Sequence, residues 1–520
     1  MARTANLLPT LDKLGVTIPA EVDAKRIAAD WFQLFSTHAI SGNVDGVSAL
    51  FAEDALWRDI LSLTWDFRTF QGESLQRFLA DRLAAAQMST FELKYDYLEL
   101  RRPYPDLAWI EAMFSFETSI GLASGVFRLI PQKGGDWKAH CMFTNLEDLK
   151  GFPEKIGPLR DWAPNHGKWA EARRRSAAFE TGDPTVLIVG GGQSGLELAA
   201  RLKCLDVSAL VIEKNARIGD NWRNRYDALC LHDPVWYDHM PYLPFPPTWP
   251  VYTPAMKLAS WLEHYAEALE VDVWTSSEVR AAAPDASGMW KVIVSNGQGE
   301  DRLFTVKHLV FATGFGSYRG NLPTYPGMRE FKGQIFHSSQ HKKATDHLDK
   351  KVVVIGACTS AHDICADYYE HGVDVTMFQR SSSYIMTTKN GWRILMDGVY
   401  SENAPPTDVV DRLNASYPMR LMEFLAPRKT LEIAEADKEL LDGLRKRGFR
   451  LNLGYKDAGF SLAVWENAGG YYLDVGTSQL IVDGNIKLKN DSPIERFTPG
   501  GLRFENGSEL PADVVVFATG

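Results

Sequence analysis

Two glycine-rich turns, each following a short apolar run, are the residues in this chain best suited to binding phosphate. The first run, 186–189, leads into Gly190, Gly192 and Gly195 in a G-x-G-x-x-G pattern. Glycines at these positions allow a tight turn, a close approach of the backbone to a pyrophosphate, and close packing of the next helix on the strand. The pattern therefore predicts a dinucleotide site rather than an ordinary loop.

The residues after the first turn continue this pattern. A helix is expected over residues 196–205, and its free N–H groups and positive end would face the phosphates. The next apolar run, 209–212, ends in Glu213, whose carboxylate could accept hydrogen bonds from ribose hydroxyls. We count Gln193, Ser194 and Lys214 with the glycines and Glu213 as candidate cofactor-binding residues, and assign this site to FAD.

The second turn begins at Gly356, after the apolar run 352–355, and differs from the first. Cys358 and Ala361 replace the later glycines, so the backbone should approach phosphates less closely. The next strand, expected over 373–378, leads into Arg380, where an arginine could bind a 2′-phosphate that a carboxylate would repel. This predicts NADPH rather than NADH, although Arg380 could also be an ordinary surface charge. Thr359 and Ser360 are further candidate cofactor-binding residues.

Length and composition describe a multidomain globular protein. A chain of 520 residues is expected to form two or three domains, and 23% charged with 45% hydrophobic residues is ordinary for such proteins. A net charge of −10 gives no electrostatic footprint for nucleic acid. The sequence has neither a membrane-spanning apolar run nor a secretory signal pattern, which predicts a cytoplasmic location.

The five cysteines are scattered and form no C-x-x-C pair. Neither a disulfide framework nor a zinc site follows from this spacing, so no metal is expected. The absence of such a pair also argues against a flavoenzyme that works through a redox dithiol.

Residues 1–150 have the pattern of a separate α+β domain. Helical spacing covers 20–35, 44–51 and 73–85, and strand-like alternation follows in 91–100, 108–118, 125–130 and 137–146. The stretch 42–59 resembles the NTF2-like, or SnoaL-like, cone fold. Members of that superfamily either catalyse or only bind and assemble. Asp54, Asp59 and His140 could be pocket groups, but a docking or homodimerisation domain is favoured.

The remaining chain has the alternating pattern of α/β units. Residues 151–183 are expected to be a linker, 184–348 an FAD-binding domain, and 349–520 an NADPH-binding domain with extra helices between about 407 and 447. The predicted fold class is thus α/β, with two Rossmann-like domains preceded by an α+β NTF2-like domain.

A motif between the two α/β units resembles a known family. Residues 331–337 match F-x-G-x-x-x-H, the signature of class B flavoprotein monooxygenases, and both turns and the sequence Ala312-Thr313-Gly314 accompany it. Baeyer-Villiger members carry Trp-Pro where this chain has His341 and Lys342, which counts against that reaction. Flavin-containing and YUCCA-type members usually have an aromatic residue there, so His341 departs from them too.

A second segment, comprising 219–222, 226–232 and 243–246, resembles the loop that covers the flavin in these enzymes. Its His232 matches YUCCA-type members, where many flavin-containing monooxygenases have Asn, and 472–476 also resembles a YUCCA-type segment. The resemblance implies catalytic roles for His232 and Asn221, and Trp222 would form a wall of the flavin site. It also implies that Thr313, Gly314 and Ser338 bind cofactor, with Thr313 and Ser338 near the nicotinamide.

The reaction implied by this resemblance uses FAD, NADPH and O2. NADPH reduces FAD, and a flavin C4a-(hydro)peroxide then delivers one oxygen atom to a small organic substrate. Two alternatives stay open. One is a flavoprotein that only binds or assembles through its NTF2-like domain, and the other is an uncoupled NADPH oxidase that releases hydrogen peroxide.

The chain ends in Ala518-Thr519-Gly520, a repeat of Ala312-Thr313-Gly314. In the resembled enzymes, a further segment after the second such turn completes the FAD domain. The sequence therefore predicts a truncated chain, in which the C-terminal part of the FAD domain is missing and activity is doubtful.

Overall fold

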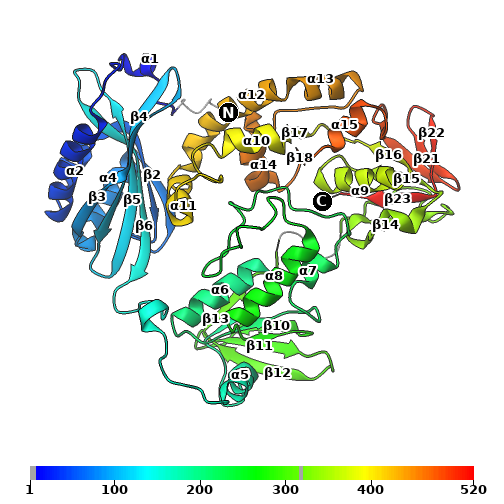
Figure 1. The fold of residues 1–520 in the computed structure, drawn as a ribbon, viewed down its shortest axis with the longest axis horizontal. Helices are drawn as coiled ribbons and strands as arrows, with labels where there is room; N and C mark the ends of the chain where they lie inside the picture. The colour runs from blue at the N-terminus through cyan, green and yellow to red at the C-terminus, as the bar shows by residue number, and fades with distance from the viewer. Residues whose placement is uncertain (1–6, 315–319, 520) are drawn as a thin grey trace. The chain divides into compact units, whose positions relative to one another are not determined.

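The computed structural model describes residues 7–314 and 320–519, which divide into two compact units (Figure 1). The first unit combines residues 1–153 with 396–428, and the second combines 154–395 with 429–520. The sequence pattern places 396–428 in the second dinucleotide domain, whereas in the structure this segment packs with the N-terminal residues. The segments 1–153 and 396–428 are far apart in the sequence. The periodicity of hydrophobic residues carries no information about which distant segments pack together.

The first unit is built on a mixed six-stranded sheet in the order β2-β1-β6-β5-β4-β3. Strands β1 and β6 are parallel, and the other neighbours are antiparallel. The elements are α1 (Leu11–Leu14), α2 (Ala24–Ile40), α3 (Val44–Ala49), β1 (Phe51–Ile60), β2 (Phe67–Gln71), α4 (Glu73–Ala86), β3 (Ser89–Tyr104), β4 (Leu107–Glu117), β5 (Gly121–Pro131), β6 (Trp137–Leu149), α11 (Thr407–Ala415) and, up to residue 428, α12 (Met419–Ala436).

The three helices and four strands expected in residues 1–150 are all present, but β1 and β2 were not predicted. Strand β1 contains a register shift between Phe51 and Leu56 in its pairing with β6. Such a bulge interrupts the two-residue alternation by which a strand is recognised in a sequence. The order of elements is therefore not helices followed by a sheet, because the first two strands come before α4.

Both faces of this sheet are covered. Phe127 and Leu129 of β5 join the cluster formed with the aromatic residues of α2, including Trp31 and Phe35. Their neighbour Val126 packs on the opposite side, with α11. Successive strand residues point to opposite faces, so the near-continuous burial of β4 and β5 follows from two covers rather than one.

The second unit contains two parallel sheets with the same local topology. One has the order β13-β7-β8-β9, and the other has the order β14-β23-β15-β16-β19. In each sheet, a glycine-rich turn and a helix connect two neighbouring strands, β7 to β8 in one and β15 to β16 in the other. A three-stranded antiparallel sheet then precedes the strand, β13 or β23, that lies on the other side of β7 or β15. Their strands are β7 (Val186–Val189), β8 (Ala209–Ile212), β9 (Val273–Trp274), β13 (His308–Phe311), β14 (Gln334–His337), β15 (Lys351–Ile355), β16 (Asp374–Phe378), β19 (Lys487–Lys489) and β23 (Val514–Phe517).

The other elements of this unit surround the two sheets. The antiparallel sheets are β10 (Glu278–Pro284), β11 (Trp290–Ser295) and β12 (Asp301–Val306), and β20 (Ile494–Thr498), β21 (Gly501–Phe504) and β22 (Glu509–Pro511); β17 (Tyr384–Thr387) pairs with β18 (Tyr471–Asp474). The helices are α5 (Trp169–Ala178), α6 (Gln193–Cys204), α7 (Asp220–Arg223), α8 (Ala255–Ala268), α9 (Thr359–Glu370), α10 (Thr388–Leu395), α13 (Lys438–Lys446), α14 (Gly459–Asn467) and α15 (Thr477–Val482).

Two further details differ from the expected division of the chain. Strand β14 lies before residue 348, yet it pairs with β23 in the second parallel sheet. The expected linker 151–183 contains the helix α5. The final turn residue, Gly520, lies outside the described residues.

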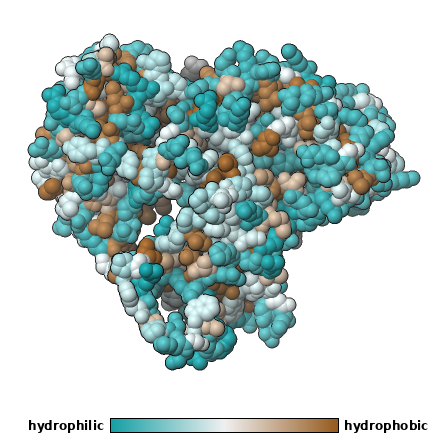
Figure 2. Space-filling model, in the orientation of Figure 1, coloured by the Kyte–Doolittle hydropathy of each residue, from teal (hydrophilic) through white to brown (hydrophobic). Residues whose placement is uncertain are grey.

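Hydrophilic side chains cover most of the surface visible in Figure 2, with hydrophobic ones scattered among them. Within residues 7–314 and 320–519, no helix is long and apolar enough to cross a membrane.

Candidate active site

The first glycine turn has the geometry that the sequence predicts. Gly190 follows β7 with φ +114°, and a Cβ there would lie 2.3 Å from the carbonyl oxygen of Ala312. A Cβ on Gly195, in the first turn of α6, would lie 2.0 Å from the carbonyl oxygen of Gly190. Only glycine fits at either position without displacing backbone, so strand, turn and helix are held at the shortest spacing.

The N-terminus of α6 is open to a phosphate. Gln193 and Ser194 are exposed, and no side chain caps the helix, whose N-cap is Gly192. The first N–H groups of a helix lack partners within it and carry its positive end, so an uncapped start attracts an anion. The Asn221 side chain lies beside this turn, with its nitrogen 3.5 Å from the position a Cβ would take on Gly192. These features fit a pyrophosphate.

Glu213 follows β8 and is buried. One carboxylate oxygen accepts a hydrogen bond from the N–H of Gly191 (2.8 Å), and the other accepts two from Asn215 (2.8 and 2.7 Å). Glu213 thus secures the glycine turn, a role that the sequence pattern did not indicate. Each carboxylate oxygen can accept more than one hydrogen bond, so a ribose hydroxyl remains a compatible partner.

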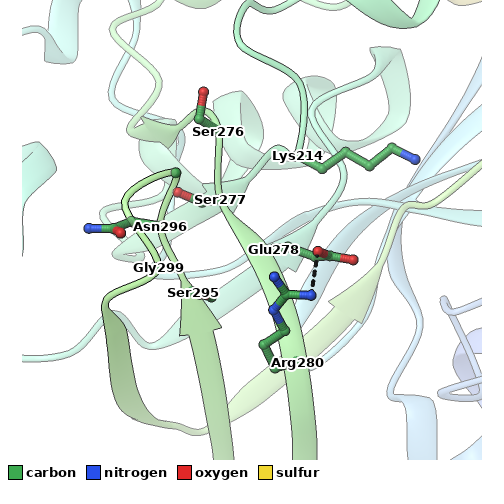
Figure 3. Close-up of a pocket in the computed structure, with 9 residues that line it drawn as sticks. Lys214, Ser276, Ser277, Glu278, Arg280, Ser295, Asn296 and Gly299 are labelled. Carbon is green, nitrogen blue, oxygen red and sulfur yellow. Dashed lines mark ion pairs between the residues drawn. The ribbon is translucent and has the colours of Figure 1, made fainter.

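A shallow pocket of about 300 Å³ lies next to the end of β8 (Figure 3). Lys214 lines it together with residues near the start of β10 and the end of β11, and Glu278 and Arg280 form an ion pair at 2.8 Å on its wall. Asn221, Trp222 and His232 do not line this pocket. Lys214 therefore lines a pocket that includes none of the residues that the sequence assigns to catalysis.

The second turn repeats the geometry of the first. Gly356 has φ +140°, and a Cβ on it would lie 2.4 Å from the carbonyl oxygen of Ala518. The N–H of Ala518 donates to Ile355 at 2.8 Å, as the N–H of Ala312 donates to Val189 at 2.8 Å. Thr359 and Ser360 begin α9, which also has no side-chain cap. Ala312 and Ala518 thus each pack against the first glycine of a turn.

Arg380 has an exposed side chain just beyond β16, on a backbone that is firmly held. The neighbouring Gln379 is buried and exchanges two hydrogen bonds with the backbone of Arg450, each 2.8 Å. The Arg450 guanidinium in turn donates to the carbonyl oxygens of Gln379 (2.7 Å) and Arg380 (2.8 Å). Gln379 and Arg450 are missed by sequence reasoning, because no local pattern connects residues this far apart.

His232 is buried, and both of its ring nitrogens have partners. Nδ1 lies 2.7 Å from the carbonyl oxygen of Leu473, and Nε2 lies 3.2 Å from Asp363 of α9. Burial lowers the pKa of His232, but the hydrogen bond and charge of Asp363 outweigh it, and the net pKa is raised. A carbonyl and a carboxylate both accept, so the protonated ring satisfies both partners.

Two more side chains complete this network, and neither was predicted. The Tyr226 hydroxyl donates to Asp363 at 2.8 Å, and the Trp392 indole donates to the carbonyl oxygen of His232 at 2.8 Å. The loop 226–232 of the first dinucleotide half is thereby bonded to α9 and α10 of the second. The only sequence signal for Asp363 is an acid among apolar residues soon after the second glycine turn.

Trp222 of α7 packs against the apolar clusters of both halves of the second unit. Its indole N–H is buried and has no hydrogen-bond partner among the described residues. A buried donor without an acceptor is costly, so this N–H fits a polar atom of a bound cofactor. Asn221 and Trp222 are adjacent on α7, between the first glycine turn and the His232 loop.

The F-x-G-x-x-x-H segment has a structural basis. A Cβ on Gly333 would lie 2.2 Å from the carbonyl oxygen of Asp513, and Phe331 is buried beside it. The His337 Nε2 lies 2.7 Å from the carbonyl oxygen of Thr519. The motif thus fastens β14 to both ends of β23.

The other predicted cofactor residues lie in two places. Thr313 is exposed and Gly314 has φ +82°, just before the undescribed residues 315–319. Ser338 is buried at the end of β14, where its carbonyl oxygen accepts from His341 at 3.2 Å. Within the described residues, no group of three or more His, Cys, Asp or Glu side chains could hold a metal ion.

Of the three polar residues considered in the N-terminal unit, Asp59 is the most deeply buried. Its carboxylate accepts from Thr144 (2.6 Å), Ser62 (2.6 Å) and the backbone and hydroxyl of Thr64 (2.8 Å each). Such a satisfied carboxylate stabilises the sheet. Asp54 is paired with Lys13 at 2.7 Å.

Buried His140 completes this set of three residues. Burial lowers its pKa to about 4. The ring therefore stays neutral at physiological pH.

Comparisons with known proteins identify relatives of this chain. Residues 183–520 match the family described as flavin-binding monooxygenase-like. The chain is 30% identical over 347 residues to indole-3-pyruvate monooxygenase YUCCA1 of Oryza sativa subsp. japonica, covering 66% of this chain and 77% of that protein. It is 28% identical over 342 residues to the probable indole-3-pyruvate monooxygenase YUCCA4 of Arabidopsis thaliana, covering 65% and 75%.

Among solved structures, similarity extends to a flavin-containing monooxygenase from Stenotrophomonas maltophilia, with 17% identity and a TM-score of 0.45. That match covers 65% of this chain and 79% of the other. An open structure of cyclohexanone monooxygenase gives 19% identity and a TM-score of 0.46, covering 65% and 74%.

Proposed function

We propose, from the premise that this chain belongs to the flavin-binding monooxygenase-like family, that its two glycine turns divide FAD and NADPH between them and that the His232 network organises the site where they react. The chain is an NADPH- and FAD-dependent monooxygenase that inserts one oxygen atom of O2 into a small organic substrate. FAD supplies hydride acceptance and oxygen activation, and the protein supplies binding, orientation and exclusion of water.

The observation that carries the FAD assignment is the uncapped start of α6 beside the buried, unpartnered indole N–H of Trp222. Gly190, Gly192 and Gly195 would admit the pyrophosphate, and Gln193 and Ser194 would donate their backbone N–H groups to it. Glu213 would bind the ribose. Asn221 would donate its amide to the same cofactor, and we assign it the catalytic hydrogen bond near the flavin.

His232 takes a positioning role in this proposal. Its ring nitrogens already serve Leu473 and Asp363, so the ring is held in place. The raised pKa of His232 favours the protonated ring, which would help to stabilise negative charge that develops on oxygen during the reaction.

The N-terminal unit is proposed to be NTF2-like. This proposal is supported by the resemblance of residues 42–59 to that fold and by the mixed sheet packed against α2 and α4. Catalysis in this unit is disfavoured, because aromatic side chains fill the helix side of the sheet and Asp59 is fully hydrogen-bonded. A homodimer and a cytoplasmic location stay predictions.

The monooxygenase assignment predicts a yellow protein whose NADPH consumption depends on O2. Indole-3-pyruvate, the compound in the names of the YUCCA relatives, belongs in the substrate panel with a thioether, a tertiary amine and a cyclic ketone. We expect one of these classes to lower the hydrogen peroxide released per NADPH and to yield an oxygenated product. Release of one hydrogen peroxide for each NADPH consumed, with every substrate, would instead favour the uncoupled oxidase.

Replacing Arg380 with alanine is expected to lower kcat/KM for NADPH about 10- to 100-fold and to leave NADH nearly unchanged. A charge-assisted pair with the 2′-phosphate contributes about 1.5–3 kcal/mol, and each 1.4 kcal/mol is a factor of ten. Steady-state kinetics with both cofactors measures this. Arg217→Ala, at an exposed arginine paired with Glu263, is the control. Equal losses with both cofactors would remove Arg380 from the phosphate site.

A further inference from the structure

One face of the N-terminal sheet, the face opposite α2, is covered by residues 396–428 of the same chain, a segment that we call the excursion. We propose that this face is a receptor for the excursion, so that the N-terminal unit acts as a clamp on a segment of its own chain. This role is independent of the monooxygenase reaction. It differs from the dimerisation that the sequence suggests, because the chain's own helices take the place of a second copy.

The centre of the clamp is a buried arginine. Arg128 of β5 is 2% exposed and donates to Ser416 Oγ at 2.8 Å, while its guanidinium lies 2.7 Å from Glu111. The same guanidinium stacks on the ring of Tyr417, 3.7 Å from its centroid. A buried arginine is costly unless its charge is paired and its N–H groups are hydrogen-bonded. Glu111 supplies the charge, and Ser416 and Tyr417 of the excursion supply a hydrogen bond and a stacked ring.

Two bidentate ion pairs flank this centre. Arg412 binds both carboxylate oxygens of Glu147 at 2.6 and 2.7 Å, and Arg428 binds both oxygens of Asp106 at 2.7 and 2.9 Å. Bidentate pairing fixes orientation as well as distance. Both arginines lie on the excursion. Glu147 lies near the end of β6, and Asp106 lies between β3 and β4.

Apolar side chains fill the space between the polar contacts. Leu421 and Leu425 of α12 pack with Trp109 and Ile130, and Val409 and Leu413 of α11 pack with Met113, Val126 and Phe143. Figure 1 shows α11 lying along this sheet. An apolar core surrounded by arginine pairs is the composition of a specific protein interface.

The excursion is close in sequence to the candidate active site. It begins at Met396, directly after α10, whose Trp392 donates to the carbonyl oxygen of His232. The segment that the N-terminal unit holds is thus the direct continuation in sequence of a helix that contacts the His232 loop.

Hydrogen exchange of the full-length protein tests the clamp through a charge swap. We expect Arg428→Asp to speed amide exchange in 407–428 about tenfold, and the double variant Asp106→Arg with Arg428→Asp to restore protection. Arg217→Glu, which breaks another bidentate pair, is the control and should leave 407–428 protected. Arg128→Met should increase the rate of amide exchange in 407–428 more than Arg428→Asp does. If the Arg128→Met protein does not fold, the charge swap still tests the proposal.

Two results would overturn the proposal. The first is rapid exchange of 407–428 in the dilute wild-type monomer with protection appearing only on dimerisation, which would assign the face to a second copy. The second is a double variant as unprotected as Arg428→Asp, since the pair would then not hold the excursion.

Discussion

A valine in place of Gly195 is expected to leave the purified protein without FAD. Its Cβ would start 2.0 Å from the carbonyl oxygen of Gly190, so α6 must move away from β7. That movement withdraws the helix N–H groups from the pyrophosphate. Loss of two charge-assisted hydrogen bonds, each about 1.5–3 kcal/mol, corresponds to at least a hundredfold weaker FAD binding.

Flavin absorbance after reconstitution, with titration of FAD into the apoprotein, measures this effect. Gly182→Ala is the matched control, because a Cβ there meets nothing within 4 Å and the backbone needs no positive φ. Ala361→Gly tests the second turn, where the chain already carries the larger residue, and should leave FAD binding unchanged. A yellow Gly195→Val protein with normal affinity would contradict the assignment of FAD to the first turn.

Replacing Asp363 with asparagine is expected to lower the free energy of unfolding by about 3 kcal/mol at pH 6, because it leaves a buried imidazolium without its counter-charge. The pKa of His232 is raised in the folded protein. The stabilisation is therefore complete below the unfolded pKa of about 6.5 and is lost as pH rises through the higher folded value.

Denaturant unfolding at pH 6 and pH 9 tests both the size and the sign of this effect. The difference between wild type and Asp363→Asn should shrink from pH 6 to pH 9, because the stabilisation is lost as pH rises through the folded pKa of His232. Asp374→Asn, at an exposed pair with Lys487, should change stability by less than about 1 kcal/mol at both pH values. An Asp363→Asn effect that is equal at pH 6 and pH 9 would show that the His232 proton is not involved.

The cofactor turns were predictable because their determinants are local. A strand, a turn that needs glycine, a helix and a terminal acid or arginine follow one another within about thirty residues, and backbone sterics fix which residues fit. Gly190 and Gly356 accordingly have the strained φ values that the pattern implies. The helices of residues 1–150 were predictable for the same reason, whereas the bulge in β1 hid a strand by breaking its alternation.

The partners of the predicted catalytic residues were not predictable. The hydrogen bonds of His232 connect it to residues 363, 392 and 473, which lie on separate elements of the second unit. Sequence reasoning identified His232 by resemblance and assigned it a catalytic role. Only the tertiary structure shows that both of its ring nitrogens have protein partners, and this supports the positioning role proposed for the ring.

The sequence by itself determined the two glycine turns and the family, because each depends on short-range backbone geometry and on residue types at fixed spacing. Only the tertiary structure decided that 396–428 packs on the N-terminal sheet and that Asp363 holds His232. Both involve buried charged groups: His232 is paired with Asp363, and Arg128, paired with Glu111, also bonds to the distant Ser416. Such pairing is set by how the chain folds back on itself, which local patterns do not encode.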